Sequence, residues 1–87
     1  MSASRTLSVG RKSISDYIME VVLLFQEGHD RLVVKGVGPY ISKAVDLYNA
    51  LVSRIGESIE LVNVSIGSER VRGRLKPYIL IEIKRKY

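Results

Sequence analysis

The sequence contains no cysteine and no long apolar run, and each absence excludes a class of protein. Without cysteine the chain has neither a disulfide framework nor a thiolate metal site, which fits an intracellular protein. No apolar stretch approaches the ~20 residues needed to cross a bilayer. The N-terminal segment 1–6 also lacks the apolar core of a signal peptide. We therefore expect a cytoplasmic protein without membrane contact.

Motifs for catalysis and for cofactor binding are missing as well. The sequence has no phosphate-binding loop, no dinucleotide fingerprint and no nucleophile–histidine–aspartate set. His29 is the one histidine; it follows Gly28, has no second ligand at metal spacing, and is expected in a surface turn. No titratable pair has a spacing suited to acid–base catalysis. We predict that the protein is not an enzyme and has no metal or cofactor site.

Positive charge is what the sequence has in excess. Its 87 residues include 14 Lys and Arg against 9 Asp and Glu, a formal net charge of +5. Such an excess favours polyanionic partners. A chain of this length builds a core that is only just sufficient. We expect one domain over residues 1–87, with residues 1–5 as a disordered tail, which folds alone or gains stability by oligomerising.

Two segments have the periodicity of amphipathic helices. The first is expected over residues 13–27, with Ser13 and Asp16 in a capping pair and Gly28 at its end. The second is expected to be entered through Pro39 and to end at Gly56. Its apolar stripe consists of Ile41, Ala44, Val45, Tyr48, Leu51, Val52 and Ile55, with Leu47 and Ala50 beside it.

Four segments have the residue pattern of β-strands. They are expected over residues 6–9, 31–36, 58–69 and 76–86. A change of phase near Leu61 and Val62 predicts a β-bulge in the third strand.

The element order β-α-β-α-β-β predicts the fold class. The β-α-β unit gives a parallel strand pair with a right-handed crossover, and the final hairpin adds antiparallel strands. We expect an α/β fold, more narrowly α+β. It should be a two-layer sandwich in which both helices lie on one face of a four-stranded mixed sheet. Strands of ~11 residues extend about 36 Å, whereas helices of ~15 residues span about 22 Å. The C-terminal hairpin should therefore protrude.

The tip of this hairpin is the most cationic segment of the chain. Residues 69–76, expected to be flexible, contain Arg70, Arg72, Arg74 and Lys76 around Gly73, and Glu69 is their only acid. A solvated hairpin end is the plain alternative. The density of cations on a protruding segment favours contact with a polyanion, because arginine can bind phosphate in a bidentate manner.

Three segments resemble the Alba family of small basic archaeal chromatin proteins. Residues 9–12, Val-Gly-Arg-Lys, resemble the family's turn of a glycine and two basic residues after the first strand. Residues 38–46, Gly-Pro-Tyr-Ile-Ser-Lys-Ala-Val-Asp, resemble its G-x-x-I-S-K-A-V-D segment and are the most specific match. Residues 64–68, Val-Ser-Ile-Gly-Ser, lie where the family enters its long hairpin. The resemblance covers residues 7–86.

The resemblance implies a chromosome-associated dimer that binds double-stranded DNA without strong sequence preference, and many members also bind RNA. It implies that Arg11 and Lys12 contact the nucleic-acid backbone from the body, with Lys43 nearby. It places the basic side chains of the hairpin along the minor groove. Acetylation of a lysine in the basic turn is known in the family, and Lys12 is the corresponding candidate here. We expect the dimer interface on the second helix, at Tyr48, Leu51 and Ile55.

The chain departs from the family pattern at the turn before the second helix. Val37 and Pro39 stand where members often have arginines, which removes charge from the body. Ile55 lies where some members use an aromatic residue to join dimers. The divergent turn is typical of the second paralogue type, which forms heterodimers with the first.

Three functions remain open from the sequence. The preferred one is a dimeric architectural protein that binds double-stranded DNA. The second is an RNA-binding protein of an RNA-processing or RNA-stabilising particle. The third is a heterodimer partner that modulates the packaging of DNA by a paralogue.

Overall fold

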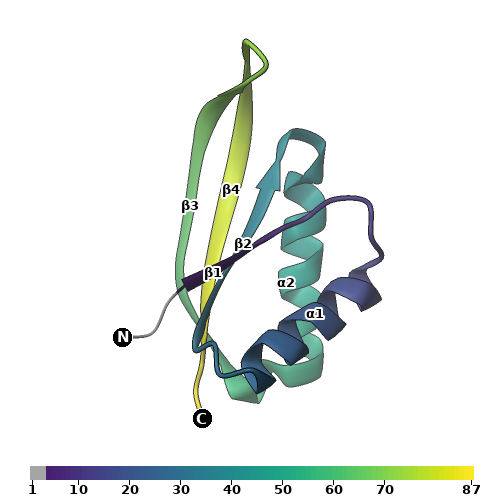
Figure 1. Ribbon diagram of the computed structural model, residues 1–87, viewed down its shortest axis with the longest axis vertical. Helices are drawn as coiled ribbons and strands as arrows, with labels where there is room; N and C mark the ends of the chain where they lie inside the picture. The colour runs from purple at the N-terminus through teal and green to yellow at the C-terminus, as the bar shows by residue number, and fades with distance from the viewer. Residues whose placement is uncertain (1–3) are drawn as a thin grey trace.

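The computed structural model describes residues 4–87 as a sheet covered on one face by two helices (Figure 1). The elements in chain order are β1 (Ser4–Ser8), α1 (Ile14–Gln26), β2 (Arg31–Val37), α2 (Ile41–Ile55), β3 (Ile59–Val71) and β4 (Arg74–Arg85), with 3-10 turns at Gly38–Tyr40 and Gly56–Ser58. The predicted two-layer α+β fold is confirmed.

The sheet order is β1-β2-β4-β3. β1 runs parallel to β2, and the other two pairings are antiparallel. The predicted bulge is confirmed, since the register between β3 and β4 shifts between Leu61 and Asn63. The expected tail of residues 1–5 is corrected at its end, because Ser4 and Arg5 pair with β2. Residues 1–3 lie outside the described part of the chain.

The two ends of α1 follow the predicted signals. The Ser13 hydroxyl accepts a hydrogen bond from the backbone N–H of Asp16 at 3.1 Å, so the capping prediction is confirmed. Gly28 adopts a positive φ of 99° just after the helix, a conformation that favours glycine. α2 instead follows directly after the 3-10 turn Gly38–Tyr40, and Pro39 is among the first residues of that turn.

The core lies between the helices and the inner face of the sheet. The side chains with no exposed surface are Val21, Leu32, Val34, Ala44, Leu47, Leu51 and Ile83. The expected apolar stripe of α2 is therefore rotated: Leu47 is central to the core, whereas Val45 and Val52 are exposed. Leu51 is fully buried within the protomer, so its side chain is not available to a partner.

The hairpin of β3 and β4 is paired up to its last two residues. The ladder runs to the Val71–Arg74 pair, so residues 69–76 form a paired ribbon rather than an open tip. Arg72 and Gly73 make the turn with φ values of 52° and 79°. Two successive positive φ values are typical of the type I′ turn, whose twist matches the flanking strands.

Neither helix within residues 4–87 has the length and apolar character needed to cross a membrane.

Close packing between β2 and α2 depends on Gly36. A Cβ atom at this position would lie 2.5 Å from the backbone oxygen of Tyr40 and 2.8 Å from the Cβ of Ala44. We predict that Gly36→Ala lowers the free energy of unfolding by about 1–3 kcal/mol, because the helix must move away from the strand. Chemical denaturation measures this change.

Gly56→Ala is the matched control. Gly56 has a helical φ of −56°, and the nearest atom to an added Cβ is 3.4 Å away. An equal loss of stability in both variants would contradict the close-packing explanation.

Candidate nucleic-acid interface

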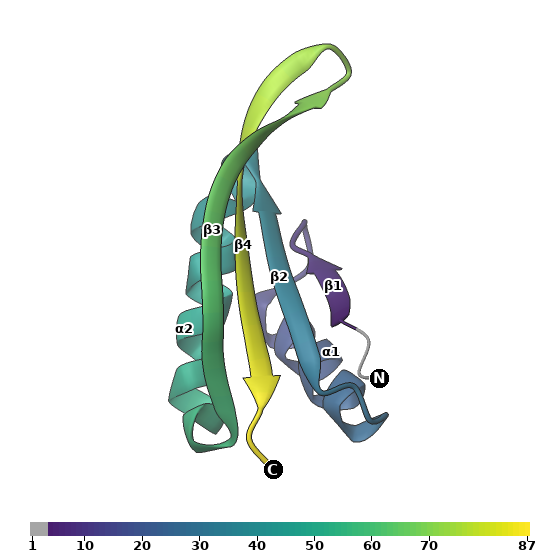
Figure 2. The same cartoon turned by 90° about the vertical axis from the view of Figure 1, so that its left-hand side faces the viewer.

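The protruding end of the hairpin, residues 68–77, forms an arm beyond the sheet (Figure 2). β2 pairs with β4 only as far as Val37 and Tyr78. Beyond that point four cross-strand pairs join β3 and β4 without a third strand. The molecule is 41 Å long on its longest axis, and the arm extends away from the helices (Figure 1).

The cations of the arm are spread around the ribbon. Glu69 pairs with Lys76 and Val71 pairs with Arg74, while Arg70 pairs with Leu75 between them. Because cross-strand partners share a face and successive residues alternate, Arg74 and Lys76 lie on one face and Arg70 on the other. Arg72 projects from the turn. The arm therefore presents positive charge on both faces and at its end.

The three body residues that the sequence predicts do come together. The backbone N–H of Gly10 donates to the Tyr17 hydroxyl at 2.6 Å, which fixes the turn between β1 and α1. The Lys43 ammonium donates to the backbone oxygen of Gly10 at 2.7 Å and lies 5.6 Å from the centre of the Tyr17 ring. Lys43 thus joins α2 to the turn that carries Arg11 and Lys12. Its ammonium is partly committed to this structural role.

Lys12 has a partner that the sequence analysis did not identify. Its ammonium donates to the Glu20 carboxylate, one of the ion pairs within residues 4–87. This hydrogen bond, together with the attraction of the Glu20 charge, raises the pKa of Lys12 above its ordinary value. Lys12 and Glu20 are eight positions apart in sequence. Ion pairs within a helix are predicted from spacings of three or four residues, so the sequence did not indicate this pair. Arg11 is exposed as well, but within residues 4–87 it makes no ion pair.

Lys76 is the arm cation nearest to the body. Its Cδ atom would be 3.9 Å from a Cβ atom at Gly38, in the turn before α2. This turn carries Val37 and Pro39, neither of which is charged. A cation of the hairpin thus lies beside an uncharged turn of the body.

Cations on the open face of the sheet are held by glutamates. Arg31 pairs with Glu82 at 3.0 Å, Lys35 with Glu69 at 2.9 Å and Lys84 with Glu60 at 3.8 Å. Within residues 4–87, no ion pair involves Arg70, Arg72 or Arg74. Charge pairing therefore separates the arginines of the arm from the cations of the sheet.

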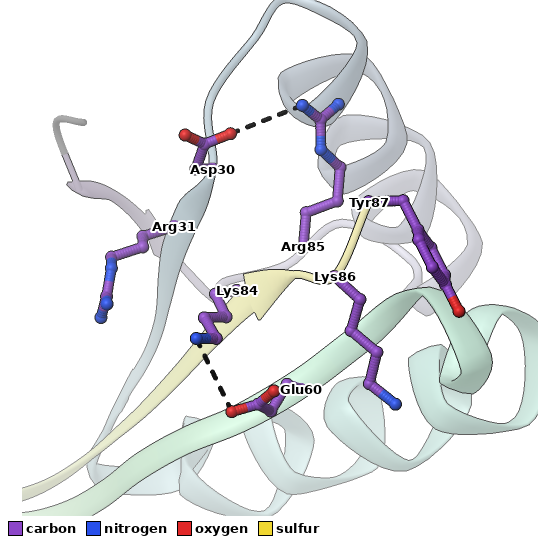
Figure 3. Close-up of a pocket in the computed structure, with 7 residues that line it drawn as sticks. All are labelled: Asp30, Arg31, Glu60, Lys84, Arg85, Lys86 and Tyr87. Carbon is purple, nitrogen blue, oxygen red and sulfur yellow. Dashed lines mark hydrogen bonds and ion pairs between the residues drawn. The ribbon is translucent and has the colours of Figure 1, made fainter. Parts of the chain in front are cut away.

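The basic C-terminal segment lines a hollow at the end of the sheet opposite the arm (Figures 1 and 3). Its volume is about 440 Å³, and its lining also includes Asp30 and Glu60. Arg85 donates to the backbone oxygen of Phe25 at 2.8 Å and approaches the Asp30 carboxylate at 3.4 Å. Arg85 therefore fixes the end of α1, and the mixed charge of the hollow does not favour a polyanion.

The exposed apolar side chains of α2 and β3 form a second surface. α2 packs over β2 and β4, which leaves the inner side of the edge strand β3 uncovered. We call the following residues the apolar edge: Val45, Val52, Leu61, Val64 and Ile66, of which Ile66 is 80 % exposed. Of the predicted interface residues, Tyr48 and Ile55 are half-buried beside it and Leu51 is not part of it.

Groups of three or more histidine, aspartate or glutamate side chains placed to hold a metal ion do not occur among residues 4–87.

Comparison with known proteins agrees with this architecture. Residues 5–68 match the family model described as Alba. The chain is 47 % identical over 76 residues to DNA/RNA-binding protein Alba 2 of Saccharolobus shibatae, which covers 87 % of this chain and 85 % of the relative. It is 46 % identical, with the same coverage, to the protein of that name from Saccharolobus solfataricus.

Solved structures show the same fold. Alba from Thermoplasma volcanium superposes with a TM-score of 0.84 at 24 % identity, covering 93 % of this chain and all of that one. ALBA1 from Trypanosoma brucei gives a TM-score of 0.81 at 18 % identity, covering 93 % of this chain and 68 % of the other. Because a single family model spans most of the sequence and the two Saccharolobus proteins are identical to this chain at nearly half of the aligned residues, this chain belongs to the Alba family.

Proposed function

We propose that this protein is a dimeric, chromosome-associated protein that binds double-stranded DNA with little sequence preference. The observation that carries the proposal is the set of exposed arginines on a protruding arm, outside the glutamate pairs that hold the sheet cations. The names of the two Saccharolobus relatives, which describe DNA/RNA-binding proteins, support nucleic acid as the ligand.

The arm would act in the minor groove. A duplex groove has a phosphate backbone on each side, so a ribbon with cations on both faces can contact both backbones at once. Arg74 and Lys76 would face one backbone and Arg70 the other, with Arg72 leading. The negative potential of a narrow minor groove favours arginine in particular. Such contacts release counterions and carry little sequence information.

The basic turn would add contacts from the body. Arg11 is exposed before the first turn of α1, where the helix dipole also favours an anion. Figure 1 shows this turn and the start of α2 on the half of the body from which the arm extends. Lys12 and Lys43 lie in the same place, each with an internal partner that a phosphate would have to share.

Dimerisation through the apolar edge would bring two arms together. Lys43 marks the flank of α2 that faces α1, and Val45 and Val52 lie on the opposite flank, toward β3. An exposed strip shared by a helix and an edge strand suits a symmetric partner, because a second copy offers the same strip in return. A paralogue of the same fold could replace the second copy. Tyr48 and Ile55 would border this interface.

RNA is the second candidate ligand, because the names of the two Saccharolobus relatives mention both DNA and RNA binding. The A-form minor groove is wide and shallow, so an arm that depends on a narrow groove would fit it less well. Structured RNA would then be bound mainly through phosphates.

The arm prediction concerns Arg72→Ala combined with Arg74→Ala. A titration of duplex DNA over a salt series should show weaker binding and a shallower salt dependence. The slope of log K against log salt should fall by about 3 to 4 units per dimer, since each lost phosphate contact changes it by about 0.9.

The matched control removes the same charge from paired cations. Arg31→Ala with Lys84→Ala also lowers the net charge by two per protomer, but at the end of the sheet opposite the arm. If this control weakens binding as much as the arm variant does, a general charge effect replaces the proposed arm contact.

The ligand prediction compares duplex DNA with structured RNA of equal length at matched salt. We expect the wild-type protein to prefer DNA and the arm variant to lose that preference, because the arm fits the narrower groove. Tighter binding to RNA would favour the RNA-particle function instead.

The dimer prediction uses Val52→Glu, which places a charge on the apolar edge. Sedimentation should show a dimer for the wild-type protein and a monomer for the variant. Leu23→Glu is the control, since Leu23 is similarly exposed but lies on α1. A wild-type monomer that pairs only with a paralogue would support the heterodimer alternative, and a Val52→Glu dimer would exclude the apolar edge.

A further inference from the structure

The direction of the arm depends on contacts at its base. Four cross-strand pairs extend beyond Val37, the last residue of β2 in the ladder. A two-stranded ribbon of this kind is only marginally ordered in water by itself. Side chains at the base of the ribbon therefore contribute to its orientation relative to the body.

The first of these contacts is between Gly67 and Tyr78, which are cross-strand partners. The Tyr78 ring lies across the glycine so closely that an added Cβ atom would be 2.5 Å from its hydroxyl oxygen and 2.6 Å from Cζ. Any larger side chain at Gly67 would displace the ring. Glycine opposite an aromatic residue allows the strand to bend while the ring covers the exposed backbone.

The second contact joins the body to the arm. The Lys35 ammonium of β2 lies 5.6 Å from the centre of the Tyr78 ring and 2.9 Å from a carboxylate oxygen of Glu69. Both charged side chains are about two-thirds covered or more, with 28 % and 35 % of their surfaces exposed. We call Lys35, Gly67, Glu69 and Tyr78 the arm-base cluster.

The Lys35–Glu69 pair differs from other ion pairs of the sheet in what it connects. Glu60 and Lys84 are direct partners in one ladder, so their pair adds little to the geometry of the strands. Lys35 is instead opposite Leu80 and Glu69 is opposite Lys76, so this pair crosses β4 to join two strands that are not neighbours. Figure 2 shows the hairpin of β3 and β4 curving beyond the end of β2.

The presence of Glu69 also needs an explanation in terms of charge. It is the only acid between Glu60 and Glu82. A carboxylate on an arm that contacts phosphates would weaken binding if it faced the ligand. Its pairing with Lys35 turns it toward the body, where its effect is on geometry.

We propose that the arm-base cluster sets the direction of the arm in the free protein, with Lys35 and Glu69 as positioning residues. One consequence of this inference rests on the proposed function: an arm that is already oriented loses less conformational entropy when it binds nucleic acid. In the free protein the cluster acts without any ligand.

Spin-label distance measurements on the free protein test the proposal. The chain has no cysteine, so Asn49→Cys on α2 and Val71→Cys on the arm place two labels unambiguously. Dilution with unlabelled protein restricts the signal to pairs within one chain. Lys35→Met and Glu69→Gln should each broaden the distance distribution by roughly twofold, because the marginal ribbon becomes free to move.

Two further variants make the result decisive. Lys35→Glu with Glu69→Lys restores an ion pair of reversed sign and should return the distribution to nearly its original width. Glu60→Gln removes the ion-pair partner of Lys84, far from the arm, and should leave the distance distribution unchanged. Unchanged distributions in both single variants, or a reversed pair as broad as they are, would overturn the proposal.

Binding then separates this proposal from the proposed function. Glu69→Gln and Glu60→Gln raise the net charge equally, so charge alone predicts equal gains in duplex affinity. With arm orientation at work, Glu69→Gln should bind about threefold more weakly than Glu60→Gln. Equal affinities alongside a broadened distribution would show that orientation does not serve duplex binding. Failure of all variants to bind DNA would reject the function and leave the distance result intact.

Discussion

β4 is hydrogen-bonded on both sides, and the rest of the structure depends on this double pairing. Its ladder with β2 stops at Tyr78, whereas its ladder with β3 continues to Arg74. The same strand therefore buries Ile81 and Ile83 beneath the helices and carries cations beyond them. A shift of one residue in this register would exchange the two faces. The buried isoleucines thus determine on which face of the arm each basic residue lies.

The distribution of charge follows the same division between body and arm. Glutamates pair with Arg31, Lys35 and Lys84 on the sheet, whereas the arm arginines Arg70, Arg72 and Arg74 lie outside such pairs. A protein with a net charge of +5 can in this way present a stronger local field than its total charge indicates. The Val37 and Pro39 turn adds no charge to the body, which increases the relative weight of the arm.

The fold could be predicted closely because its signals are local. Ser13, Gly28 and the phase change near Leu61 each mark a boundary or irregularity through neighbouring residues alone. The rotation of α2 could not be predicted, since the pattern does not say which of several apolar residues faces the sheet. Partners distant in sequence, such as Lys35 with Glu69, were also missed, because only the folded chain brings them together. The arm cations were identified from sequence, but their arrangement on two faces needed the register.

The ion pair between Lys12 and Glu20 has a consequence for any modification of the basic turn. If the Lys12 amine were acetylated, its positive charge would disappear and the carboxylate of Glu20 would lose its counterion. The surface beside Arg11 would then carry an unpaired carboxylate in place of a neutral ion pair. A single acetyl group would thereby lower the local charge that an approaching phosphate meets by one unit, and Glu20 would make the charge that remains negative.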